Sequence, residues 1–317
     1  KNLSLISKEK VYSFQANNII MRSSDYLKDF QRILLAKKIE EGSSLIIHEW
    51  KTGSHCFENA PYILEDRKIS NKFITTGWKD SSDRNLVPLG HFSFSRDMIR
   101  TLKNYKKKVN QNGTCLITQG ALAEYNFEYN APRETRKSFM EDLYKFYTNL
   151  NNDIKLSTII RPKPSDSKLS RSIGSNYDNI ITNLWKKKFS NAVVDFRTHF
   201  QSLLNNARVC VVTWPNCSVY INTLCLNIPT IIFFTKNDHS FTKYFETDFD
   251  MLKEVGIFHT SPLSAATKIN SIWENVGEWW GSEKLQKARK KFCEGNHIYP
   301  KKYGSFLKEI SDKEKLN

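Results

Sequence analysis

Long apolar runs are missing from this chain of 317 residues. The longest run, residues 228–234, has the length of a β-strand, whereas a helix that crosses a membrane needs about 20 apolar residues. The first ten residues also lack the apolar centre of a secretory signal peptide. The sequence therefore predicts a cytoplasmic protein, whose association with a membrane, if any, is peripheral and at the inner face.

Cysteine pairs of the kind that hold metal ions are missing too. The six cysteines include no C-x-x-C pair. Cys210, Cys217 and Cys225 lie in apolar or helical surroundings, as buried free thiols do in a reducing compartment. The motifs of P-loops, dinucleotide-binding folds, zinc proteases and serine hydrolases do not occur. We therefore expect neither a bound metal ion nor a cofactor.

Acidic residues are few relative to basic ones. The chain has 33 Asp and Glu against 48 Lys and Arg, which gives a net charge of +15 at pH 7. This excess favours a negatively charged partner: nucleic acid, the phosphates of a nucleotide, or an anionic membrane face. The hydrophobic content of 39% is ordinary for a globular protein, and the length suits one large α/β unit or two smaller ones.

Strand-like and helix-like segments alternate along the chain, which indicates parallel sheets covered by helices. In the N-terminal part we expect strands at residues 44–48 and 72–76 and helices at 25–41 and 59–69, followed by a polar, turn-rich crossover at 81–90. From residue 114 to 259 the rhythm predicts a Rossmann-like, doubly wound parallel sheet. Its strands are expected at residues 114–118, 155–160, 192–195, 208–213, 229–234 and 256–259, and helices at 133–150, 199–206, 217–226, 240–255, 262–273 and 282–293.

These elements suggest three parts. Residues 1–95 form part of an N-terminal α/β domain, residues 96–295 a Rossmann-like domain, and residues 296–317 a basic helix or tail. The first part is short for a complete Rossmann domain, and the chain begins with Lys1 rather than Met. We therefore expect further sequence on the N-terminal side.

Polar side chains follow two central strands of the predicted sheet, at the edge where open parallel sheets bind their ligands. Arg161 and Lys163 come directly after a strand; a guanidinium fork and an ammonium group suit a phosphate, although a solvated loop explains them equally well. Thr213, Asn216 and Ser218 lead into a helix, where their polar groups either bind an anion or simply cap the helix.

Asn237, Asp238 and His239 follow the most apolar strand, and His48 ends an N-terminal strand. Carboxylates and histidines act as general bases, but polar loops and structural histidines are more common. Lysines that follow Tyr105 and Trp185 suggest base stacking on nucleic acid, and solvated helix ends explain them more simply.

The C-terminal third resembles a known group of enzymes. Residues 216–234, NCSVYINTLCLNIPTIIFF, are similar to the nucleotide-sugar-binding segment of GT-B glycosyltransferases. A closer resemblance, over residues 208–295, is to a family of bacterial surface-polysaccharide (O-antigen-type) transferases that are distantly similar to CDP-glycerol and Kdo transferases. It rests on residues 252–262 (LKEVGIFHTSP) and 288–293 (ARKKFC). Upstream, residues 48–53 occupy the place of a His-Gly motif of that family, and residues 76–79 resemble the strand that follows it.

This resemblance implies a GT-B fold and a metal-independent glycosyltransferase. The enzyme would move a sugar from a nucleotide-sugar donor to a surface-glycan or lipid-linked acceptor, and specific binding of nucleic acid is not expected. His48 would lie in the cleft of the enzyme, and it or Asp238 would serve as the base. The resemblance implies that the donor phosphates are bound by Arg161, Lys163, Thr213, Asn216 and Ser218, and the nucleotide or sugar by Asn222, Asn237 and His239.

Two departures from the family pattern keep alternatives open. Asn222 stands where the family has a glutamate that holds the ribose, and an amide makes a weaker bond to a hydroxyl than a carboxylate does. Glu49 and Trp50 replace the small residues of the His-Gly motif. The alternatives are a CDP-glycerol-like polyol-phosphate transferase, a basic nucleic-acid-binding module, and a non-catalytic relative of the transferases.

Overall fold

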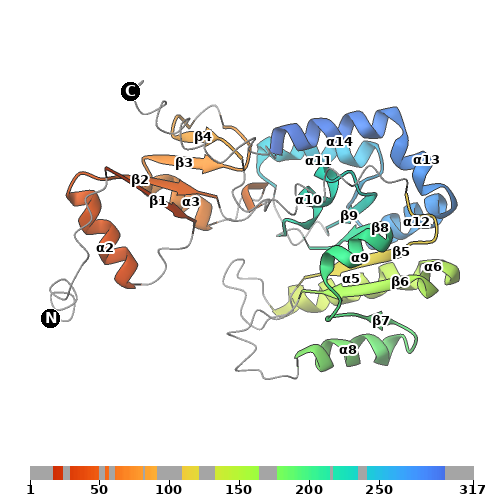
Figure 1. Ribbon diagram of the computed structural model, residues 1–317. Helices are drawn as coiled ribbons and strands as arrows, with labels where there is room; N and C mark the ends of the chain where they lie inside the picture. The colour runs from red at the N-terminus through yellow and green to blue at the C-terminus, as the bar shows by residue number, and fades with distance from the viewer. Residues whose placement is uncertain are drawn as a thin grey trace. The chain divides into compact units, whose positions relative to one another are not determined.

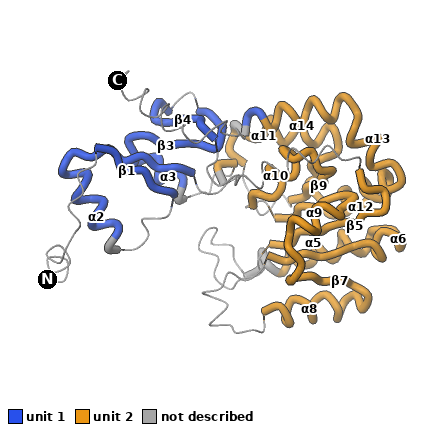
Figure 2. The backbone as a smooth tube through the Cα atoms, in the orientation of Figure 1, with its two compact units in different colours: residues 1–52, 60–95, 294–317 blue, residues 53–59, 96–293 orange. Residues whose placement is uncertain are grey.

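The computed structural model describes residues 17–23, 29–49, 54–56, 61–80, 83–90, 109–120, 133–163, 177–214, 217–234 and 241–296 (Figure 1). The chain divides into two compact units (Figure 2). The first consists of residues 1–52, 60–95 and 294–317, and the second of residues 53–59 and 96–293. Each unit contains a parallel β-sheet of its own.

The sheet of the first unit has four parallel strands in the order β1-β2-β3-β4. Successive side chains of β2, Leu45, Ile46 and Ile47, are all at most 1% exposed, as expected for a strand covered on both faces. Its strands are β1 (Asn18–Arg22), β2 (Ser44–His48), β3 (Lys72–Thr75) and β4 (Leu86–Pro88), and its helices are α2 (Asp29–Glu40) and α3 (Pro61–Ile69). The strands predicted at 44–48 and 72–76 are confirmed.

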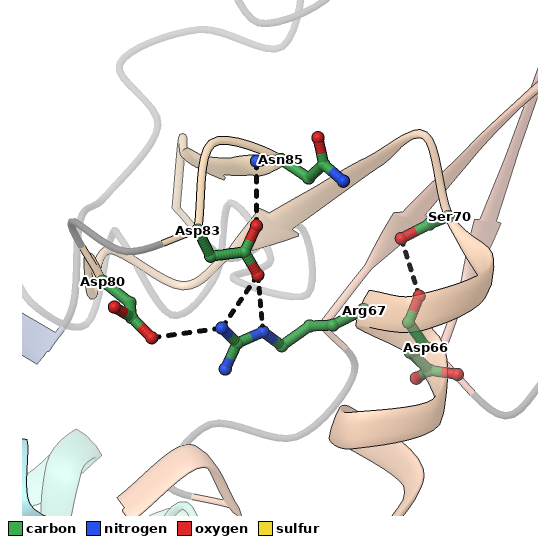
Figure 3. A network of polar contacts seen from close by, with 6 residues as sticks. All are labelled: Asp66, Arg67, Ser70, Asp80, Asp83 and Asn85. Carbon is green, nitrogen blue, oxygen red and sulfur yellow. Dashed lines mark hydrogen bonds and ion pairs between the residues drawn. The ribbon is translucent and has the colours of Figure 1, made fainter.

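The connection between β3 and β4 differs from the prediction. Residues 81–90 were expected to be a turn-rich crossover, but their second half is strand β4. The described part of the connection, residues 76–80 and 83–85, forms no helix, although crossovers between parallel strands usually contain one. An ion pair holds it instead (Figure 3): Arg67 of α3 donates to Asp83 at 2.9 Å and to Asp80 at 3.1 Å, and Asp83 accepts from the Asn85 backbone.

The sheet of the second unit has six parallel strands in the order β10-β9-β8-β5-β6-β7. Helices α5, α8 and α12 share a buried apolar cluster with one face, and α9 and α10 pack against the other, so the predicted doubly wound, Rossmann-like α/β fold is confirmed. The strands are β5 (Thr114–Gln119), β6 (Thr158–Pro162), β7 (Val193–Val194), β8 (Ala207–Val212), β9 (Thr230–Phe233) and β10 (Phe258–His259).

The helices of the second unit cover the strand connections, as Figure 1 shows. The 3-10 turn η1 (Ser54–Cys56) joins this unit because the Cys56 carbonyl accepts from the Thr242 amide at 3.0 Å. The helices are α5 (Arg133–Thr148), α6 (Asn152–Leu156), α8 (Tyr177–Lys188), α9 (Phe200–Asn206), α10 (Val219–Cys225), α11 (Lys243–Glu254), α12 (Pro262–Ile272), α13 (Val276–Gly281) and α14 (Glu283–Asn296), with the turn η3 (Trp273–Asn275).

Two segments of this unit differ from the predictions. Residues 155–160 were expected to be one strand, but helix α6 runs to Leu156 and β6 begins at Thr158, because Ile154 turns into the core, where it is fully buried. Helix α8 was foreseen only at its lysine-rich end. Its Trp185 is fully buried, so this ring is not available for base stacking; the simpler explanation, lysines at a helix end, is confirmed. The Tyr105 segment lies outside the described residues.

The six cysteines are free thiols, and Cys56, Cys115 and Cys210 are buried. Burial raises the pKa of Cys115 to about 12, because a thiolate is poorly solvated in the core. Within the described residues, no helix is both long and apolar enough to span a membrane. Residues 297–317, most of the predicted basic tail, lie outside the described residues.

Candidate functional site

The strand order of the second unit places a switch point between β5 and β8. From β5 the chain proceeds to β6 and β7 on one side, and from β8 it proceeds to β9 and β10 on the other. Connections that leave in opposite directions open a crevice at the carboxyl ends of the two strands, and ligands of open α/β sheets bind there. In this chain those ends are Gln119 and Thr213.

Threonine hydroxyls join the two strands at this edge. Thr213 donates its hydroxyl proton to the Thr118 carbonyl at 2.7 Å, and Thr118 donates its own to the Val211 carbonyl at 3.1 Å. Both threonines are buried. Thr213, a predicted phosphate ligand, thus spends its proton within the sheet edge and retains oxygen lone pairs for a donor group.

Gly120 and Trp214 follow the two strands and pack closely together. A Cβ atom at position 120 would lie only 2.5 Å from the Trp214 side chain, so only glycine fits under the indole. The same indole meets Phe139 of α5 edge-on, with ring centroids 5.1 Å apart. Neither residue was among the predicted site residues. A glycine directly after a strand and a tryptophan after the neighbouring strand were the available signals.

The two predicted phosphate-binding cations lie at the end of β6, the strand beside β5. Arg161 is half-buried and donates to the Asp195 carbonyl at 2.9 Å. Lys163 is exposed, and its backbone N–H donates to the Gln119 carbonyl at 2.8 Å. The structure therefore brings both cations to the edge that carries the switch point, one strand away from it.

Asp195 carries a negative charge in this region. Burial alone would raise the pKa of its carboxyl group, but hydrogen bonds from Thr198 and the Arg197 backbone, together with the charge of Arg161, outweigh burial and lower the pKa. The carboxylate is thus ionised at neutral pH and helps to fix the loop that supports Arg161.

The remaining predicted donor ligands of the second unit lie on or before α10, or outside the described residues. Ser218 precedes α10, and its carbonyl accepts from the Asn222 N–H at 2.9 Å. The Asn222 side-chain oxygen is buried and has no hydrogen-bond partner among the described residues. Asn216, Asn237, Asp238 and His239 fall outside them.

In the first unit, His48 ends β2 and is only 1% exposed. Its Nε2 lies 3.1 Å from the Gly90 carbonyl, which follows β4, and Gly90 takes the left-handed φ of +104° that favours glycine. The geometry fixes the ring at the carboxyl end of this sheet.

Glu49 forms a buried network that sequence reasoning missed. Its Oε2 accepts from the Thr76 backbone N–H at 3.0 Å, the Thr76 hydroxyl at 3.1 Å and the Trp78 indole N–H at 2.7 Å. All three residues are nearly inaccessible to solvent. The carboxylate in the place of a small residue therefore ties the end of β2 to the loop after β3. A Thr and a Trp beyond the next strand were the only signals.

Two doubly wound parallel sheets in one chain define an α/β protein with Rossmann-like units and strand-end crevices. Residues 1–298 match the LIC12162 family transferase, and the chain belongs to this family. Among the residues that the structure describes, no three His, Cys, Asp or Glu side chains gather where they could hold a metal ion.

A search of curated proteins finds no match. Solved structures with similar folds include a UDP-glucosyltransferase from Polygonum tinctorium (9% identity, TM-score 0.49, covering 99% of this chain and 78% of that one). Another is a UDP-N-acetylglucosamine 2-epimerase, described as putative, from Listeria monocytogenes (8%, 0.46, 93% and 72%). A third is the glycosyltransferase of kitacinnamycin (8%, 0.45, 95% and 76%).

Proposed function

We propose that this transferase moves a sugar from a nucleotide-sugar donor to a surface-glycan or lipid-linked acceptor without a metal ion. The observation that carries the proposal is the pair of cations, Arg161 and Lys163, at the sheet edge that contains the switch point. Membership of a transferase family and a net charge of +15 support it, since a donor with a diphosphate is strongly anionic.

In this proposal the cations do the work of a metal. The guanidinium of Arg161 and the ammonium of Lys163 stabilise the negative charge that develops on the departing nucleotide diphosphate. The oxygen of Thr213 and the polar groups of Asn216 and Ser218 complete the phosphate site. Asn222, whose side-chain oxygen has no protein partner in the described structure, accepts from a ribose or sugar hydroxyl, and Asn237 and His239 contact the same part of the donor.

The acceptor hydroxyl needs a base, and we assign this role to His48 or Asp238. A histidine that hydrogen-bonds a backbone carbonyl through one ring nitrogen has that nitrogen protonated, which directs the basic lone pair to the other nitrogen. An acceptor linked to a lipid would bring the protein to an anionic membrane face, where its positive charge favours peripheral binding.

A polyol-phosphate transferase is the second candidate, because the same cations would hold a CDP-linked polyol. The two reactions differ in the bond that breaks: transfer of a polyol phosphate leaves a nucleoside monophosphate, whereas transfer of a sugar leaves a nucleoside diphosphate. Product analysis by mass therefore separates them.

A thermal-shift panel tests the proposal. CMP, CDP, UDP, GDP and ADP are compared with a short oligonucleotide at low and moderate salt. We expect one nucleotide to stabilise the protein selectively, and Arg161→Ala to weaken its binding about 10- to 100-fold. Lys155→Ala is the matched control, because it removes one cation near the opposite end of β6. Indifference to every nucleotide, with binding of the oligonucleotide that falls steeply with salt, would overturn the proposal.

A further inference from the structure

We infer that the side-chain NH2 group of Gln119 is a hydrogen-bond donor to a phosphate oxygen of the bound nucleotide. The inference rests on the proposed function and adds to it a ligand-contacting residue that no cation or motif marks. Gln119 is the last residue of β5, one of the two strands at the switch point.

The orientation of the Gln119 amide is fixed by its partner. The Trp185 indole N–H lies 2.8 Å from the side-chain oxygen of Gln119. An indole nitrogen only donates hydrogen bonds, so the atom that faces it must be the oxygen, and the NH2 group must point elsewhere. Trp185 itself is fully buried and packs edge-on against Tyr144, with ring centroids 5.2 Å apart. The anchor of the amide is therefore rigid.

The NH2 group has nothing to bind within the described protein. Gln119 is 3% exposed, and its Nε2 is buried without a hydrogen-bond partner among the described residues. Native proteins leave few buried donors unsatisfied, because a donor that has lost water without gaining an acceptor destabilises the fold. A group from outside the chain must satisfy it, either a substrate atom or a buried water molecule.

The position of Gln119 favours a phosphate oxygen. Its own carbonyl accepts from the backbone N–H of Lys163, and its neighbour Thr118 lies opposite Arg161 in the β5–β6 register. The orphan donor therefore lies at the sheet edge where two cations and the switch point are found. An NH2 group beside such cations complements an anionic acceptor, and the hydrogen bond is strengthened by the charge of the phosphate.

Binding measurements with Gln119→Met and Gln119→Glu test this inference. Methionine keeps the length of the side chain without its polar atoms. Glutamate keeps an acceptor for Trp185 but replaces the NH2 group with oxygen, so at pH 8 it fails to donate. We expect both variants to bind the selected nucleotide, and inorganic pyrophosphate, about 10- to 100-fold more weakly than the wild type.

Thr158→Val is the matched control. It removes another buried hydrogen bond, from the Thr158 hydroxyl to the Ile154 carbonyl, at the opposite end of β6. We expect it to lower the melting temperature and to leave the affinity for nucleotide unchanged. A Gln119 variant that is folded and binds nucleotide as the wild type does would overturn the inference and assign the NH2 group to a water molecule. If only Gln119→Glu folds, its affinity decides alone. Wild-type protein that binds neither nucleotide nor pyrophosphate would overturn the proposed function as well.

Discussion

Removing the carboxylate of Glu49 should destabilise the first unit by several kcal/mol. In the structure its Oε2 accepts from the Thr76 N–H, the Thr76 hydroxyl and the Trp78 indole, all out of contact with solvent. Glu49→Ala strands two N–H donors that cannot turn away, at about 1–3 kcal/mol each, whereas the hydroxyl can rotate. Relief from burying the carboxylate charge offsets part of this loss. We expect a net destabilisation of about 2–4 kcal/mol.

Glu49→Gln supplies the comparison, because a neutral oxygen still accepts from the same donors. It loses only the strengthening that comes from charge, so we expect a destabilisation of about 1–2 kcal/mol. Urea unfolding followed by circular dichroism measures both values, and the variants should shift the unfolding step of the first unit. Faster hydrogen exchange at the Thr76 amide is the local readout. A loss below about 1 kcal/mol in Glu49→Ala, with unchanged exchange, would refute the reasoning.

Two further predictions concern the second unit. Gly120→Ala places a methyl group 2.5 Å from the Trp214 side chain, so we expect a destabilisation of about 1–3 kcal/mol and weaker nucleotide binding; Gly281→Ala, with open space around its Cβ position, is the near-neutral control in thermal melting. Burial lowers the pKa of His259 below its usual value of about 6.5, so the unfolded chain takes up the proton first as the pH falls. Below about pH 6.5 the melting temperature should therefore fall more steeply in the wild type than in His259→Asn, and parallel pH profiles would contradict this.

The sequence was most informative where a strand is apolar on both faces. The strands predicted at 208–213 and 229–234 differ from β8 and β9 by only one residue at most ends, because uninterrupted apolar runs bounded by polar turns have few other interpretations. Strand β4 escaped prediction because it has only three residues, and its place beside β3 is decided by the ion pairs of Arg67. Such a strand carries no periodicity of its own.

The site was foreseen only in part, for a related reason. Cations directly after a strand can be recognised from their sequence neighbours, as Arg161 and Lys163 were. The roles of Gln119 and Glu49 depend instead on tryptophans that are 66 and 29 residues away in the chain. A glutamine or glutamate at a strand end is ordinary in a sequence, and only the fold shows which of its atoms are satisfied.

The helix-free connection between β3 and β4 sets limits on how this protein can vary in length during evolution. The connection must cross the sheet from one end to the other, and Arg67 holds it at two points on the way. A deletion within residues 76–85 would draw β4 back by one position, which exchanges the faces of its side chains and removes the Gly90 carbonyl from the His48 ring. Homologous chains should therefore keep the length of this segment constant and accept their insertions and deletions elsewhere.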